Sequence, residues 1–145
     1  MKRIKSAVSD PSEYRLWYND WVAKNANGMV LDVGKSQYWE YGFDTLDSNP
    51  KLNPTYVDDI CHSKLESASY DTVLCNGMYE VVEDPQKMID ECLRIARNTV
   101  IFGFVGEYYR PYRKQWKYYN DDETIPYTER VDFSKNYHFL ICHKQ

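Results

Sequence analysis

The stretch from Met29 to Asp47 most constrains how this chain can fold. It begins with a short apolar run, Met29 to Val33, that is closed by Gly34, and it ends with a second short run, Phe43 to Asp47. A short apolar run that ends in a glycine turn is typical of a fully buried strand in a parallel sheet. The turn offers backbone N–H groups, and a carboxylate at the tip of the next strand can accept hydrogen bonds from two ribose hydroxyls. This stretch therefore outlines a nucleoside-binding α/β site.

Strands and helices alternate along the rest of the chain. Two helices are expected, one that opens at Pro11 and ends near Asn25, and one that opens at Asp84-Pro85 and has Arg94 and Arg97 in its last turn. Further strands are expected over residues 55–57, 70–74, 99–105, 127–133 and 137–143. This order predicts a mostly parallel sheet with layers on both faces, followed by an antiparallel strand pair.

The segment from Tyr70 to Pro85 is the most specific motif in the chain. It contains an apolar strand, a polar residue at the strand tip, the sequence Glu80-Val81-Val82, and Asp84-Pro85 at the start of a helix. Together with Asp32-Val33-Gly34 and Asp47, this segment resembles the class I S-adenosylmethionine-dependent methyltransferases of the methyltransferase type 11 kind. The resemblance implies a three-layer α/β sandwich with a Rossmann-like sheet that ends in an antiparallel strand pair.

The connection after the first strand is shorter than in that family. Only eight residues, Lys35 to Gly42, separate the glycine turn from the second strand, whereas a parallel crossover with its helix takes at least ten to twelve residues. We therefore expect the helix after the first strand to be shortened or missing.

The resemblance also implies a set of cofactor-binding residues. Gly34, Lys35 and Asn76 would hold the amino-acid end of S-adenosylmethionine, and Asp47 and Asp59 would hold its nucleoside. Asp58 is a rival for the role of Asp59. The full predicted set is Asp32, Gly34, Lys35, Asp47, Asp59, Ile60, Asn76 and Gly77.

Two functions are compatible with these motifs. The first is S-adenosylmethionine-dependent methyl transfer to a small-molecule or saccharide-like acceptor. The second is a degenerate relative that binds a nucleoside or a protein partner without catalysis, which the loss of two family glycines and of the family histidine, here Val81, would favour. No catalytic residue is assigned, although His62 or a tyrosine could replace that histidine as a base.

Residues 108–119 hold six aromatic and four basic side chains. This segment could be an acceptor-binding cap, a patch for nucleic acid or an anionic ligand, or a cover for the sheet. We expect residues 1–145 to form one methyltransferase-like domain, with an N-terminal helical segment (1–26), a cofactor-binding part (27–105), and an acceptor loop with the terminal strand pair (106–145).

Composition narrows the classes of partner. The net charge of −4 gives no general attraction to nucleic acid, and no apolar run approaches the roughly 20 residues of a membrane helix. The four cysteines have no paired spacing, and the histidines do not cluster with them at ligand spacing, so we expect buried thiols and no metal site. The cytoplasm is the expected compartment, and a neighbouring subunit of a homo-oligomer could complete the acceptor pocket.

Overall fold

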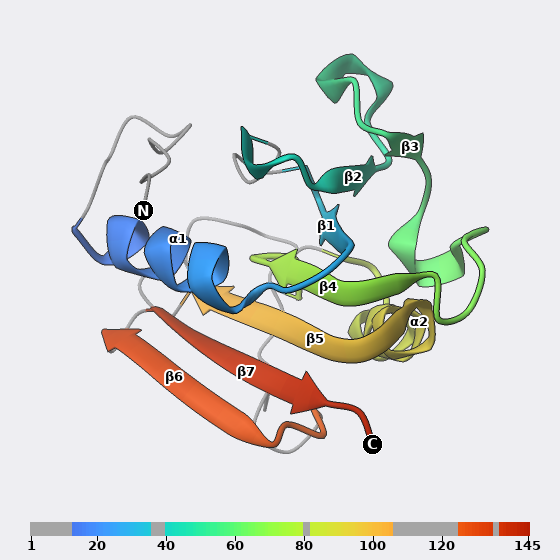
Figure 1. Cartoon of the computed structure of the whole chain (residues 1–145). Helices are drawn as coiled ribbons and strands as arrows, with labels where there is room; N and C mark the ends of the chain where they lie inside the picture. Colours follow the sequence, from blue (N-terminus) through green and yellow to red (C-terminus); the bar gives the residue numbers. More distant parts are fainter. Residues whose placement is uncertain (1–12, 36–39, 80–81, 106–124, 135–136) are drawn as a thin grey trace.

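A computed structural model describes residues 13–35, 40–79, 82–105, 125–134 and 137–145. In these ranges seven strands form one sheet in the order β3-β2-β1-β4-β5-β7-β6 (Figure 1). The strands are β1 (Val30–Val33), β2 (Asp44–Asp47), β3 (Tyr56–Val57), β4 (Tyr70–Asn76), β5 (Ala96–Val105), β6 (Glu129–Ser134) and β7 (Tyr137–His143). The first five pair in parallel, and β7 runs antiparallel to β5 and β6. The predicted fold class is therefore confirmed.

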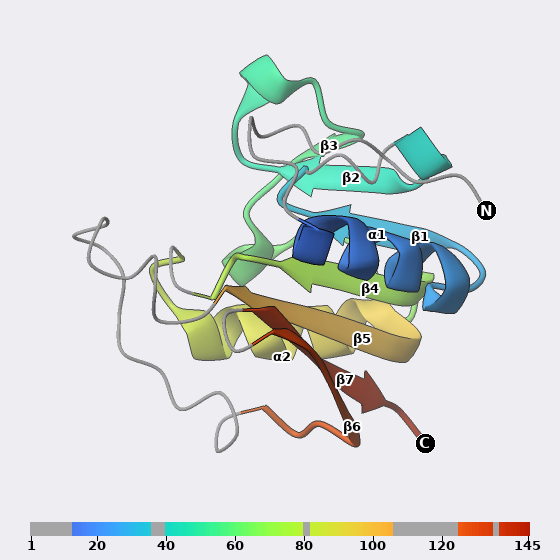
Figure 2. The same cartoon turned by 90° about the vertical axis from the view of Figure 1, so that its left-hand side faces the viewer.

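Helices α1 (Glu13–Asn25) and α2 (Pro85–Ile95) lie on opposite faces of this sheet (Figure 2). Successive strand residues point to opposite faces. On β4, Val73 belongs to the core cluster that contains Met88 of α2, whereas its neighbour Leu74 belongs to the cluster that contains Val22 of α1. The molecule thus has the three expected layers.

Two side chains of α1 pack against the sheet. Val22 is fully buried, and the ring of Trp21 meets Phe139 of β7 edge to face at 5.3 Å. Trp17 remains 42% exposed. The side chains of Tyr14 and Tyr18, and the whole of the predicted 108–119 segment, lie outside the described residues.

The sequence predicts helix α2 correctly except at its C-terminal end. Asp84 accepts a hydrogen bond from the backbone N–H of Lys87 (3.1 Å), and Pro85 occupies the first turn. The helix stops at Ile95, because Ala96 is already extended and begins β5. The expectation that Arg97 sits in the last helical turn was wrong. Its guanidinium instead bonds the carboxylate of Asp71 on β4.

The connection from β1 to β2 is tied by backbone hydrogen bonding. Its described residues, 34–35 and 40–43, include no α-helix. The N–H of Gly34 donates to the carbonyl of Leu46 (2.7 Å), which continues the pairing of β1 with β2 into the turn. Gly34 has a φ of +72°, a conformation that glycine adopts without steric cost.

All four cysteines are buried with free thiols. Burial raises the pKa of the Cys142 thiol to about 12, so this group stays protonated and behaves as a small apolar side chain. No helix among the described residues is long and apolar enough to cross a membrane.

Candidate functional site

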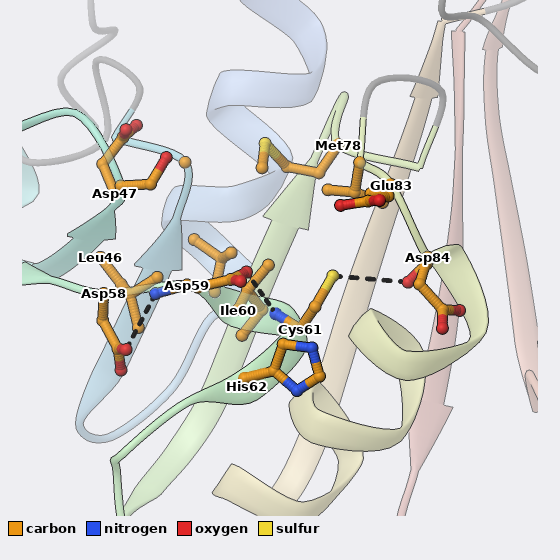
Figure 3. Close-up of a pocket in the computed structure, with 14 residues that line it drawn as sticks. Leu46, Asp47, Asp58, Asp59, Ile60, Cys61, His62, Met78, Glu83 and Asp84 are labelled. Atoms are coloured by element: carbon orange, nitrogen blue, oxygen red, sulfur yellow. Dashed lines mark hydrogen bonds between the residues drawn. The ribbon is translucent and has the colours of Figure 1, made fainter.

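A cavity of about 730 Å³ opens where β1 and β2 end (Figure 3). Its walls come from the glycine turn after β1, the end of β2, the segment after β3, and the segment that joins β4 to α2. The lining residues are Val33, Gly34, Leu46, Asp47, Ser48, Asp58, Asp59, Ile60, Cys61, His62, Met78, Val82, Glu83 and Asp84. Open parallel sheets bind ligands at this carboxyl edge.

Asp47 lines the cavity from the tip of β2 and is held by two backbone donors. Its Oδ2 accepts from the N–H of Lys35 (3.1 Å), and its Oδ1 accepts from the N–H of Asn49 (2.9 Å). A carboxylate oxygen can accept more than one hydrogen bond. Both oxygens of this fixed carboxylate therefore keep capacity for the hydroxyls of a ligand.

The neighbouring acids Asp58 and Asp59 differ in what their carboxylates do. Asp58 accepts from the N–H of Asp59 (2.8 Å), the hydroxyl of Ser63 (2.8 Å) and the N–H of Lys64 (3.0 Å), and so closes the turn around η3 (Ile60–His62). Asp59 Oδ1 caps η3 by accepting from the N–H of Cys61 (2.9 Å). Within the described residues no hydrogen bond reaches Asp59 Oδ2. Of the two rivals, Asp59 thus has the carboxylate oxygen that is better placed to accept from a ligand.

The cavity floor is apolar and closely fitted around Gly34. A Cβ on Gly34 would lie 2.4 Å from the sulfur of Met78, so the absence of a side chain lets Met78 pack against the turn. Leu46 and Ile60 are 1% and 4% exposed and complete the apolar lining. A floor of this kind suits the flat face of a nucleoside base, with polar groups at its edge.

Cys61 and His62 occupy the wall next to α2. The Cys61 thiol donates to the backbone carbonyl of Asp84 (3.5 Å), and burial raises its pKa above the ordinary value, against the opposing effect of that hydrogen bond. Burial therefore favours the protonated thiol of Cys61 over the nucleophilic thiolate. His62 lies beside Cys61 in the cavity wall (Figure 3). Its side chain is exposed, so the imidazole is accessible to a bound molecule.

Four of the eight predicted residues line the cavity: Gly34, Asp47, Asp59 and Ile60. Asp32 is fully buried within β1. The Lys35 ammonium donates to the carbonyls of Leu52 (2.7 Å) and Asn53 (3.1 Å). It therefore lies at the end of η2 (Pro50–Leu52), and Lys35 does not line the cavity.

Asn76 and Gly77, at the tip of β4, are directed toward β5 and not into the cavity. The N–H of Gly77 donates to the carbonyl of Gly103 (2.9 Å). A Cβ on Gly103 would lie 2.0 Å from Asn76 Oδ1, so the Asn76 amide rests on that glycine. Neither residue is in the cavity lining.

The structure adds lining residues that the sequence did not assign to the site. Met78, Glu83 and Asp84 reach the cavity from the β4–α2 segment, and Leu46 does so from β2. The helix-start motif at Asp84-Pro85 was the available signal, since it places the residues just before α2 at the carboxyl edge of the sheet. In the described residues no group of three or more His, Cys, Asp or Glu side chains is arranged to hold a metal ion.

The sequence matches the family model of a methyltransferase domain (Methyltransf_11) over residues 22–104. The chain belongs to this methyltransferase family. Membership indicates S-adenosylmethionine as the cofactor, as the sequence motifs implied. All four predicted residues that line the cavity fall within the matched range.

Solved structures agree with this methyltransferase assignment. The N-methyltransferase NodS from Bradyrhizobium japonicum, in complex with S-adenosyl-L-homocysteine, is similar with a TM-score of 0.70 and 12% identity, over 96% of this chain and 94% of that one. A possible histamine N-methyltransferase from Thermotoga maritima has a TM-score of 0.66 and 11% identity, over 91% and 97%. An S-adenosylmethionine-dependent methyltransferase from Aquifex aeolicus has a TM-score of 0.63 and 17% identity, over 92% and 93%. At these identities the likeness shows the fold. No curated protein sequence gives a significant match.

Proposed function

We propose that this protein binds S-adenosylmethionine in the cavity at the ends of β1 and β2 and transfers its methyl group to a small-molecule or saccharide-like acceptor. The observation that carries the proposal is Asp47, a carboxylate held by two backbone donors at the tip of β2 and facing a cavity of about 730 Å³. Ligand cavities span about 300–1,000 Å³, so the volume suits a nucleoside ligand.

The residues present divide the cavity into two parts. Asp47 would accept from the ribose hydroxyls, and Asp59 with Ile60 would contact the base. The remaining wall, which includes Glu83 and Asp84, would then face the sulfonium and the acceptor. The cofactor supplies an activated methyl group, so the protein acts chiefly by aligning the acceptor and excluding water.

A hydroxyl acceptor would need a base, and His62 is an exposed cavity residue with suitable chemistry. Replacing His62 by glutamine is then expected to lower turnover by about 10²-fold or more while the affinity for S-adenosylmethionine stays unchanged. Equal turnover of the two proteins would remove His62 from this role.

The cofactor site is tested by calorimetry with S-adenosylmethionine on the wild type and on Asp47→Ala. Loss of two charge-assisted hydrogen bonds is expected to weaken binding by at least about thirtyfold. Asp90→Ala is the matched control, because Asp90 is an exposed carboxylate on α2 outside the cavity. A folded wild type that does not bind, or an Asp47→Ala variant with unchanged affinity, would refute the proposal.

A second candidate is binding without catalysis, and one observation favours it. The two amides of the glycine turn are already engaged within the protein, Gly34 with Leu46 and Lys35 with Asp47. They are the donors that the sequence assigned to the amino-acid end of the cofactor. Binding of S-adenosylmethionine without formation of S-adenosylhomocysteine across a panel of amine, hydroxyl and saccharide acceptors would support this second function.

A further inference from the structure

We infer that the cavity distinguishes S-adenosylmethionine from the product S-adenosylhomocysteine by charge, and that Glu83 and Asp84 are specificity-determining residues for this choice. The inference rests on the proposed function. It concerns which form of the cofactor the cavity retains, and it follows from the charges that line it.

The lining is strongly acidic. Five of its residues carry carboxylates, Asp47, Asp58, Asp59, Glu83 and Asp84, and none of its fourteen residues is lysine or arginine. In Figure 3 these carboxylates lie on both sides of the cavity, Asp47 and Asp58 on one side and Glu83 and Asp84 on the other.

The nearest basic residue along the chain does not offset this charge. Lys35 follows Gly34 directly, but its ammonium is directed to the carbonyls of Leu52 and Asn53. The backbone N–H of Lys35 likewise donates to Asp47, so it is not directed into the cavity toward an anion. The described walls therefore favour cationic ligands.

Methyl transfer changes the charge of the ligand. The lone pair of the acceptor forms a bond to the methyl carbon, the carbon–sulfur bond breaks, and its electron pair stays on sulfur, while the acceptor proton passes to solvent. S-adenosylmethionine, with a sulfonium, an ammonium and a carboxylate, has a net charge of +1, and S-adenosylhomocysteine has none. The acidic cavity thus holds the substrate form more tightly than the product form.

The size of the effect follows from the cavity volume. A sphere of 730 Å³ has a radius of about 5.6 Å. Each of the five carboxylates is taken to lie roughly 7 Å from a cation at the centre of that sphere. With the dielectric constant of water and a Debye length of ~8 Å, five such charges favour the cation by about eightfold. At an ionic strength of ~15 mM the same calculation gives about fortyfold.

Calorimetry with three ligands at both ionic strengths tests the inference. S-adenosylmethionine and sinefungin, which carries a protonated amine in place of the methylated sulfur, are expected to bind more tightly than S-adenosylhomocysteine. The ratio should rise about fivefold as the salt concentration falls. Sinefungin separates the effect of charge from any contact specific to the methyl group.

A double variant assigns the effect to the cavity wall. Glu83→Gln with Asp84→Asn removes two of the five charges and keeps a side chain that caps α2, so the ratio at low salt should fall about fourfold. The matched control is Glu66→Gln with Asp90→Asn, which removes two exposed carboxylates outside the cavity and should leave the ratio unchanged.

Two outcomes would overturn the inference, and they differ in meaning. S-adenosylhomocysteine that binds as tightly as S-adenosylmethionine at low salt, or a ratio that the Glu83/Asp84 variant does not change, would refute charge selection and leave the proposed function intact. Failure of all three ligands to bind the folded protein would refute the proposed function and this inference with it.

Discussion

Replacing Gly34 by alanine tests how the turn after β1 and the cavity wall depend on each other. Gly34 has a φ of +72°, where an L-residue is strained by about 1–2 kcal/mol. The new Cβ would also lie 2.4 Å from the Met78 sulfur and 3.2 Å from its Cγ. Met78 must then leave its position, which adds about 1–3 kcal/mol for overpacking.

Gly42→Ala is the matched control for this variant. Gly42 has a φ of +84°, but a Cβ there would meet nothing within 4 Å. It therefore reports the backbone cost alone. Urea denaturation is expected to show a loss of about 1–2 kcal/mol for Gly42→Ala and about 2–5 kcal/mol for Gly34→Ala. Each kcal/mol lowers Tm by about 3 °C.

A double-mutant cycle with Met78→Ala isolates the contact. Because Met78→Ala removes the atoms that the new Cβ would meet, Gly34→Ala should cost about 1–3 kcal/mol less in the Met78→Ala background than in the wild type. Equal losses for Gly34→Ala and Gly42→Ala, or no coupling between positions 34 and 78, would refute the steric argument. Calorimetry should also show weaker S-adenosylmethionine binding for Gly34→Ala, because the displaced Met78 side chain lines the cavity.

Three further predictions concern contacts away from the cavity. Lys144→Met removes an ammonium that donates to two carbonyls at the end of α2, and should lower the free energy of unfolding in urea by about 1 kcal/mol. Unchanged stability would refute this capping role. Tyr70→Phe removes the buried hydroxyl that donates to Asp44 (2.7 Å), and should lower the free energy of unfolding by about 1–3 kcal/mol. A Tm within about 1–2 °C of the wild-type value would contradict this prediction. The Arg94 guanidinium holds the pKa of Glu91 below its ordinary value of 4.5, so this carboxylate stabilises the fold above that pH and loses its contribution as the pH falls through the lowered pKa. The stability difference between wild type and Glu91→Gln should accordingly shrink below pH 4.5, and a difference that is constant between pH 7 and pH 3 would contradict it.

The strands and α2 could be predicted because apolar runs and helix-capping residues indicate them locally in the sequence. The four residues of β1 are all buried, which a continuous apolar run indicates, although Asp32 lies among them. Helix α2 has a capping aspartate, a proline in its first turn, and buried side chains at helical spacing from Met88 to Ile95. These signals depend only on neighbours in the sequence.

The end of α2 and the direction of Lys35 could not be predicted, because distant partners decide them. Arg97 leaves the helix for β5 and bonds Asp71, which also accepts from the N–H of Met29 (2.8 Å). The Lys35 ammonium is drawn to two carbonyls that lie 17 and 18 residues along the chain. Side chains of this length reach partners that no local pattern specifies.

The choice between Asp58 and Asp59 shows the same limit at the site. Both acids precede η3, and the sequence left either one as the residue facing the base. The structure distinguishes the two carboxylates by their partners. Ser63 and Lys64 donate to Asp58, whereas one oxygen of Asp59 has no hydrogen bond from the described residues, which favours Asp59 for the proposed role.

Asp47 combines a structural role with its proposed functional one. In a longer crossover a helix after β1 would carry the chain to β2, whereas here ten residues, Gly34 to Phe43, connect the two strands. The bond from the N–H of Lys35 to Asp47 then joins the start of this connection to the tip of β2, and the continuation of the β1–β2 pairing at Gly34 supports it. The shortened connection therefore depends on the same carboxylate that the sequence assigned to the ribose. This coupling explains why the acidic tip of β2 is fixed before any ligand arrives, and why loss of that carboxylate must be judged by both unfolding and binding.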